Sequence, residues 1–165
     1  MPKRFAPLFR QHMDSVTRAW LDAVYADRRT DLTSILSQRE LVEHLPDLFD
    51  ELARLLDEEA PDAEIEDAAA RLRAYAQGRF QQGVLIDEVA RELMLMRYVL
   101  MEFLWREDAC ETGGGVREFS KTLRCASIFC DELIAQTIII YAANLRPSVR
   151  TRGSVWPPPR GRRPH

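Results

Sequence analysis

Polar side chains that could hold a ligand or move a proton gather on both sides of a glycine near the middle of the chain. Tyr75 and Arg79 precede Gly83, and two glutamates and a second arginine follow it. A phenol, guanidinium groups and carboxylates in partly apolar surroundings can bind an anion, exchange protons or bridge helices. A histidine at a helix break completes the candidate site, which consists of His44, Tyr75, Arg79, Glu88, Glu92 and Arg97.

Two interpretations of this cluster stay open at the level of sequence. Charged groups on a helix that is surrounded by neighbours are either paired for structure or used for function. The cluster is therefore a salt-bridge network that fixes helix register, or a polar switch that a ligand or partner shifts. Removing Arg97 would show whether it is buried and paired. Loss of one partner of a buried ion pair lowers the free energy of unfolding by on the order of 3–5 kcal/mol. Loss of an exposed arginine changes it by no more than about 0.5 kcal/mol.

Several kinds of catalytic chemistry lack their residues. The chain has three histidines, His12, His44 and His165, and none has the spacing of a two-histidine metal site. No serine or cysteine stands in a nucleophile–base signature. The run Gly113–Gly115 lacks the Lys-Ser/Thr of a phosphate loop. We expect no catalytic residue, no metal and no cofactor.

The periodicity of apolar residues predicts the elements that position the cluster. Residues recurring every three or four positions are typical of amphipathic helices. Ser37 and Glu40 fit a capping box that opens a helix. Pro46 interrupts the helical pattern that begins at this capping box. Gly83 suits the position after a helix end. We expect an all-α, up-down five-helix bundle with a proline-broken second helix and a long C-terminal helix, over residues 5–26, 38–56, 63–81, 85–106 and 116–144.

Charge is unevenly distributed between the body and the end of the chain. The 165 residues carry a net charge of −3, yet residues 146–165 contain six arginines and no acid. The remaining 17 basic and 26 acidic side chains give the body a charge of −9, which repels nucleic acid. We expect a folded domain over residues 1–145 and a disordered Arg/Pro-rich tail over residues 146–165.

The compartment and the assembly state follow from the cysteines and the last helix. Three cysteines form no C-x-x-C pair, and no secretory signal precedes them, so we expect a cytoplasmic protein. The apolar run over residues 133–145 is shorter than the roughly 20 residues of a membrane span. The three isoleucines of residues 138–140 surround their helix with apolar surface, which favours a second subunit and thus a homodimer.

Three segments resemble one known family. Residues 43–53 read EHLPDLFDELA, residues 75–97 read YAQGRFQQGVLIDEVARELMLMR, and residues 129–141 read FCDELIAQTIIIY. These segments resemble the N-terminal domain of RsbRD-type RsbT co-antagonist proteins, a helical domain that also occurs at the front of some bacterial sensor histidine kinases. Members often carry histidine where this chain has Tyr75.

The resemblance implies a sensory or regulatory module that signals through protein contacts in a histidine kinase or sigma-factor pathway. Its partner would be a kinase or a component of an anti-sigma pathway. The alternative is a sensor that binds a small molecule or haem inside the bundle, with His44 as the axial histidine.

Overall fold

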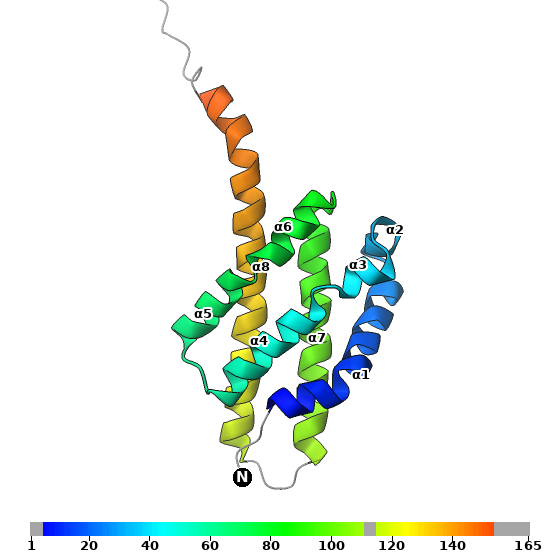
Figure 1. Ribbon diagram of the computed structural model, residues 1–165, viewed down its shortest axis with the longest axis vertical. Helices are drawn as coiled ribbons and strands as arrows, with labels where there is room; N and C mark the ends of the chain where they lie inside the picture. Colours follow the sequence, from blue (N-terminus) through cyan, green and yellow to red (C-terminus); the bar gives the residue numbers. More distant parts are fainter. Residues whose placement is uncertain (1–4, 111–114, 154–165) are drawn as a thin grey trace, which may run out of the picture.

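The computed structural model describes residues 5–110 and 115–153, and every regular element in those ranges is a helix. The all-α expectation is therefore confirmed. Figure 1 shows two long helices side by side, with shorter helices crossing them. The elements are α1 Phe5–Ala26, α2 Leu32–Ile35, α3 Gln38–Val42, α4 Leu45–Asp57, α5 Asp62–Arg71, α6 Arg73–Gln81, α7 Ile86–Cys110 and α8 Val116–Gly153.

The first helix follows its apolar stripe from end to end. α1 has the expected bounds and buries Phe9, Val16, Trp20 and Val24, which recur on one side of the helix. It packs against α4 and α7. This contact brings the Trp20 ring into the middle of the domain, where its indole N–H donates to the backbone carbonyl of Glu92 at 3.3 Å.

The expected capping box opens α3. The Ser37 hydroxyl accepts from the Glu40 backbone N–H at 3.3 Å, and the Glu40 carboxylate accepts from the Ser37 N–H at 2.8 Å. α3 ends at Val42, and α4 begins after His44 with Pro46 in its first turn. A proline costs little there, because the first backbone N–H groups of a helix have no partner within it.

The chain forms eight helical segments within the described ranges, where the sequence pattern gave five. α2 is a single turn, and a bend at Leu72 divides the predicted 63–81 helix into α5 and α6. At this bend the Leu72 carbonyl accepts from Tyr75 N–H, a tight three-residue turn. No proline or glycine marks the bend. Both halves pack on α8, so packing decides where the helix turns.

The turn between α6 and α7 follows the expected glycine chemistry. Gly83 has a φ of 78°, the left-handed conformation that ends many helices. The Val84 N–H donates to the Arg79 carbonyl and the Gly83 N–H to the Phe80 carbonyl, the two bonds of a Schellman motif. Tyr141 of α8 donates its hydroxyl to the Val84 carbonyl. The turn that carries Arg79 toward α7 is thus held from two sides.

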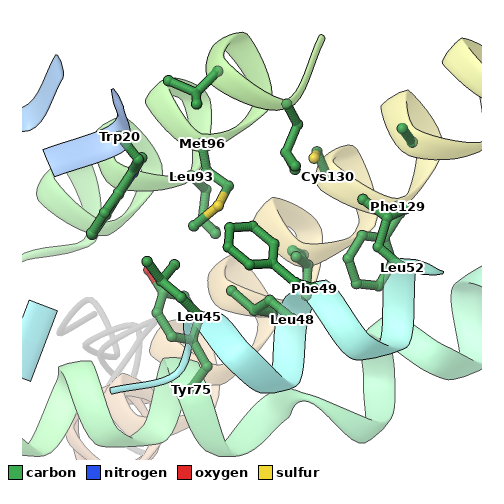
Figure 2. Packing of buried hydrophobic residues seen from close by; sticks show 14 of the residues in the cluster. Trp20, Leu45, Leu48, Phe49, Leu52, Tyr75, Leu93, Met96, Phe129 and Cys130 are labelled. Carbon is green, nitrogen blue, oxygen red and sulfur yellow. The ribbon is translucent and has the colours of Figure 1, made fainter. Parts of the chain in front are cut away.

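The long helices α7 and α8 are antiparallel neighbours that support the shorter elements. α4, α5 and α6 pack on α8, and α1 packs on α7. Figure 2 shows Phe49 of α4 between Met96 of α7 and Phe129 of α8. All three side chains are buried. The core therefore lies between the α7–α8 pair and the layer formed by α1 and α4.

The last helix continues past its expected end near Asn144 and reaches Gly153. A proline removes one backbone hydrogen bond and bends a helix, but it does not prevent the helix from continuing, so Pro147 lies within α8. Most of the predicted connector around Gly113–Gly115, and the tail from residue 154 onward, lie outside the described residues.

One described helical stretch, Val116–Asn144, is long and apolar enough to cross a membrane by length and composition. Such a test also selects core helices of globular domains. This stretch carries Ala126, Phe129 and Leu133 into the core described above. Its hydrophobicity is therefore accounted for in part by packing within the domain.

Candidate functional site

The centre of the site is an ion pair that is closed to solvent. Arg79 lies in the last turn of α6, and Glu92 lies two turns into α7. The Arg79 Nη2 is 2.6 Å from Glu92 Oε1, and its Nε is 3.0 Å from Glu92 Oε2. The side chains are 0% and 1% exposed. This two-point geometry is the strongest form of an arginine–carboxylate contact.

The remaining guanidinium hydrogens go to α3 and to the end of α6. Nη1 donates to the Glu40 carbonyl at 3.1 Å and to Gln82 Oε1 at 3.0 Å. Nη2 donates to the Leu41 carbonyl at 3.2 Å. With the two bonds to Glu92, all five N–H donors of Arg79 are used. We call Arg79, Glu92 and Gln82, with the carbonyls of Glu40 and Leu41, the arginine clamp.

The clamp compensates for the shortness of α3. The last carbonyls of any helix lack partners within it, and α3 has only five residues. A cation near these carbonyls also interacts favourably with the helix dipole. Arg79 thus caps the C-terminal end of α3, while Ser37 and Glu40 cap its start. The arginine joins α3, α6 and α7 at one point.

Electrostatics keep the clamp charged. Burial alone would lower the pKa of Arg79, but hydrogen bonds to Glu92 and its negative charge outweigh burial and raise that pKa. A guanidinium is therefore present at every physiological pH. The pair is neutral as a unit, and its internal hydrogen bonds offset the large cost of removing two ions from water.

Tyr75 lies against the clamp without completing it. The Arg79 guanidinium carbon lies 5.2 Å from the centre of the Tyr75 ring, a cation–π distance. The Tyr75 hydroxyl is buried and has no hydrogen-bond partner of good geometry among the described residues. Burial and the negative charge of Glu92 raise the pKa of Tyr75 well above its usual value. The phenol is neutral at physiological pH.

His44 packs on the other side of Tyr75. The two rings meet edge to face, with their centres 5.5 Å apart. The His44 Nε2 points at α6, where a Cβ placed on Gly78 would lie 3.5 Å away. The imidazole therefore fills space beside α6. Sequence analysis expected His44 in the cluster, and the structure places it at the edge of the cluster rather than among the clamp's hydrogen bonds.

Glu88 belongs to a neighbouring but separate contact. It lies one turn before Glu92, and its carboxylate accepts from the Thr30 hydroxyl and, at 3.2 Å, from the Asp31 backbone N–H. Thr30 in turn accepts from the Leu32 N–H. Glu88 thus fixes the start of α2 and the connection from α1. It makes none of the hydrogen bonds that Arg79 makes.

Arg97, whose burial the sequence left open, lies at the surface and outside the clamp. Its side chain is 42% exposed and pairs with Asp131, 54% exposed, at 2.8 Å. It also donates to Ser127 Oγ at 2.7 Å. Both partners belong to α8, so this contact links the two long helices at the surface. Arg97 lies more than a turn beyond Glu92, and that offset turns its side chain toward α8.

Four contributors to the clamp and its surroundings were not predicted from the sequence. Gln82 could have been found, because it lies three residues after Arg79 on the same side of a helix. The carbonyls of Glu40 and Leu41 were foreseeable only as helix-end acceptors in need of a donor. Nothing local indicated that Trp20 would donate to Glu92. The carbonyls of Glu40 and Leu41 lie 39 and 38 positions from Arg79 in the chain, and Trp20 lies 72 positions from Glu92.

The hydrogen bonds of the site join helices to one another. Its charges are mutually paired, and its phenol is held neutral. Cys125 and Cys130 lie elsewhere, on α8, where burial raises the pKa of Cys125 to about 11 and that of Cys130 to about 12. Such thiols are weak nucleophiles at neutral pH. In the described part of the chain, no three His, Cys, Asp or Glu side chains form a potential metal site.

Comparison with known proteins gives one match. The model of the RsbT co-antagonist protein RsbRD N-terminal domain family matches residues 14–155. That range contains every residue of the clamp and all eight helices apart from the first part of α1. No curated protein and no solved structure matches the chain.

Proposed function

The chain belongs to the RsbT co-antagonist RsbRD N-terminal domain family, and from that premise we propose that it is a non-catalytic module acting through protein–protein contacts. The family consists of regulatory domains of stress-response signalling by partner switching. In such signalling the output is a change of binding partner. A domain of this kind needs a surface that responds to its own internal packing, and it needs no reactive group.

The arginine clamp is the observation that carries this proposal. Every donor of Arg79 is used inside the domain, and Glu92 is inaccessible to solvent. A polar centre with all donors paired offers little to a substrate. It makes the position of α3 depend on a small number of directional bonds, which is a physical basis for two discrete packings.

We infer that a partner acts by favouring one position of α3. Side chains of α3 and of the preceding turn are exposed and can contact a partner, whereas the carbonyls of Glu40 and Leu41 are bound to Arg79. A protein that binds this surface better in one packing shifts the balance by its difference in affinity. We also propose that the protein acts in the cytoplasm and as a homodimer, as expected from the sequence.

The partner class is a switch kinase of the RsbT type or another component of an anti-sigma pathway. Isothermal titration of the purified chain with the purified RsbT-type kinase of the same genome tests this. We expect saturable binding that Arg79→Met weakens and that Arg73→Met, an exposed change on the same helix, leaves unaltered. Absence of heat with the kinase and with the anti-sigma components at about 100 µM would overturn the proposed partner class.

A further inference from the structure

The outward side of α7 carries a regular stripe that the rest of the described structure covers only in part. The centre of the Trp105 ring lies 5.2 Å from that of Phe119 on α8, and Met101 packs at the edge of the core. Asp87, Arg91, Met94, Tyr98, Met101 and Trp105 follow one another at alternating steps of four and three residues. This is the spacing of the contact positions in a two-helix coiled coil. Tyr98 is 64% exposed, Trp105 60% and Met94 49%. We call these six residues the α7 seam.

The seam is unusual for a surface that faces only water. Large aromatic and sulfur-containing side chains are enriched where proteins bind one another, and contiguous exposed apolar patches mark interaction sites. Inward-facing residues of the same helix, such as Val89, Leu93 and Met96, are buried. α7 therefore has two apolar sides, and the domain covers one of them fully and the other only in part.

We propose that the α7 seam binds the α7 seam of a second copy of this chain in the antiparallel direction. This inference rests on the proposed homodimeric function and specifies its interface. A two-fold axis passing midway between Met94 and Tyr98 sets Met94 against Tyr98 of the second copy. The same axis sets Arg91 against Met101, and Asp87 against Trp105. Every position of the seam then meets a position of the seam.

Charge complementarity selects the antiparallel direction. In that arrangement Arg91 also lies beside Glu102 of the second copy. Glu102 directly follows a seam position and is exposed, and in its own helix it pairs with Arg106 at 3.9 Å. In a parallel pairing each residue would meet its own counterpart, so Asp87 would face Asp87 and Arg91 would face Arg91. Like charges directly opposite one another oppose association, whereas opposite charges fix the register.

The size of the seam fits a dimer of modest affinity. From Asp87 to Trp105 the helix rises about 27 Å. Tyr98 and Trp105 together leave roughly 200–300 Å² exposed, given the area of aromatic side chains. With the methionines and charged stems, and doubled by symmetry, the buried area approaches about 1,200 Å², the lower limit of stable interfaces. We therefore expect the dimer to dissociate in the micromolar range.

Charge reversal tests the register directly. Sedimentation equilibrium of the full chain, from about 1 to 200 µM, measures the dissociation constant. Arg91→Glu places a glutamate beside Glu102 at two symmetric sites, and Glu102→Arg places an arginine beside Arg91. We expect each single change to weaken the dimer about tenfold. The double variant Arg91→Glu/Glu102→Arg restores the opposite charges and should regain wild-type affinity.

Mixing the two single variants sharpens the test. In the antiparallel dimer, a chain with Arg91→Glu and a chain with Glu102→Arg complement each other at both sites, so the mixture should dimerise better than either alone. Arg73→Glu on α6, a charge reversal at an exposed residue outside the seam, is the matched control and should leave the dimer intact. Circular dichroism verifies that each variant keeps its helices.

The outcomes distinguish this inference from the proposed function. Two results would overturn the antiparallel α7 interface but not dimerisation itself. One is a dimer whose dissociation constant neither single change alters. The other is a lack of recovery in both the double variant and the mixture. A wild-type chain that stays monomeric at 200 µM overturns the interface and the homodimeric part of the proposed function together. Binding of the RsbT-type kinase remains a separate result.

Discussion

Two arginine–carboxylate pairs, each with one member on α7, have similar geometry and very different surroundings. The Arg79–Glu92 pair has a closest N–O distance of 2.6 Å and is buried, whereas the Arg97–Asp131 pair has a distance of 2.8 Å and is largely exposed. Water screens the second pair and can solvate either partner alone. The first pair has no such alternative. Burial, rather than distance, therefore decides which pair the fold depends on.

The largest expected effect comes from breaking the buried pair. Arg79→Met removes the cation and leaves Glu92 buried without a partner, and it strands the α3 carbonyls of Glu40 and Leu41. We expect a loss of about 3–5 kcal/mol in the free energy of unfolding, measured by urea denaturation. Arg73→Met provides the control on the same helix. A loss below about 1 kcal/mol would show that the buried pair is no more important than a surface pair.

A conservative change separates charge from geometry. Arg79→Lys keeps the positive charge but cannot make the two-point contact with Glu92 or supply five donors. We expect an intermediate loss of roughly 1.5–3 kcal/mol, the range for hydrogen bonds that involve charged groups. Urea denaturation measures this loss too. Equal stability of the lysine variant and the wild type would mean that charge alone holds α3, and the directional argument would fail.

Acidification probes the exposed side of the comparison. Burial alone would raise the pKa of Glu51, but hydrogen bonds from Arg54 and Arg71 outweigh it and lower that pKa; the same arginines lower the pKa of Glu64. A lowered folded-state pKa contributes stability above the unfolded value, and that stability is lost as pH falls through the folded value. Thermal melts from pH 6 to pH 3 should therefore show a decreasing midpoint.

The matched variant for the pH series is Arg54→Met/Arg71→Met. Without these arginines the two glutamates have no reason for a lowered pKa, so the decrease of the midpoint below about pH 4.5 should become shallower. Both glutamates are accessible to solvent, and screening limits the effect. An unchanged slope in the double variant would assign the acid sensitivity to other carboxylates.

The smallest expected effect comes from the exposed pair. Arg97→Ala should change the free energy of unfolding by no more than about 0.5 kcal/mol, because solvent screens its contact with Asp131. The same denaturation experiment measures it beside Arg79→Met. A loss above about 2 kcal/mol would contradict the assignment of Arg97 to the surface and remove the contrast between the two pairs.

Local patterns in the sequence were sufficient for the elements that local physics controls. The stripe of α1, the capping box at Ser37 and the glycine turn at Gly83 each depend on residues within a few positions of one another. The bend at Leu72 was missed for the opposite reason, since it has no local marker and follows from packing on α8. Counting helices by periodicity alone therefore joined α5 to α6.

The candidate site was predictable in its residue types and only partly in its arrangement. Glu92 was identified because charges on an apolar helix are paired or functional, Arg79 because it lies beside the glycine turn, and together they form the clamp. Arg97 is also a charged residue on this apolar helix, but its position on α7 turns its side chain toward α8 and solvent. A helical position a few residues away points in another direction, and periodicity alone does not specify which neighbour each side of α7 meets.

The sequence by itself determined an all-helical domain, its caps and turns, and the family to which it belongs, because these depend on short-range propensities and on contiguous motifs. Only the tertiary structure decided that Arg79 caps α3, that Trp20 reaches Glu92, and that Arg97 is exposed. The physical reason is that these contacts join residues more than 30 positions apart. Their partners are set by how the helices pack, which no single segment encodes.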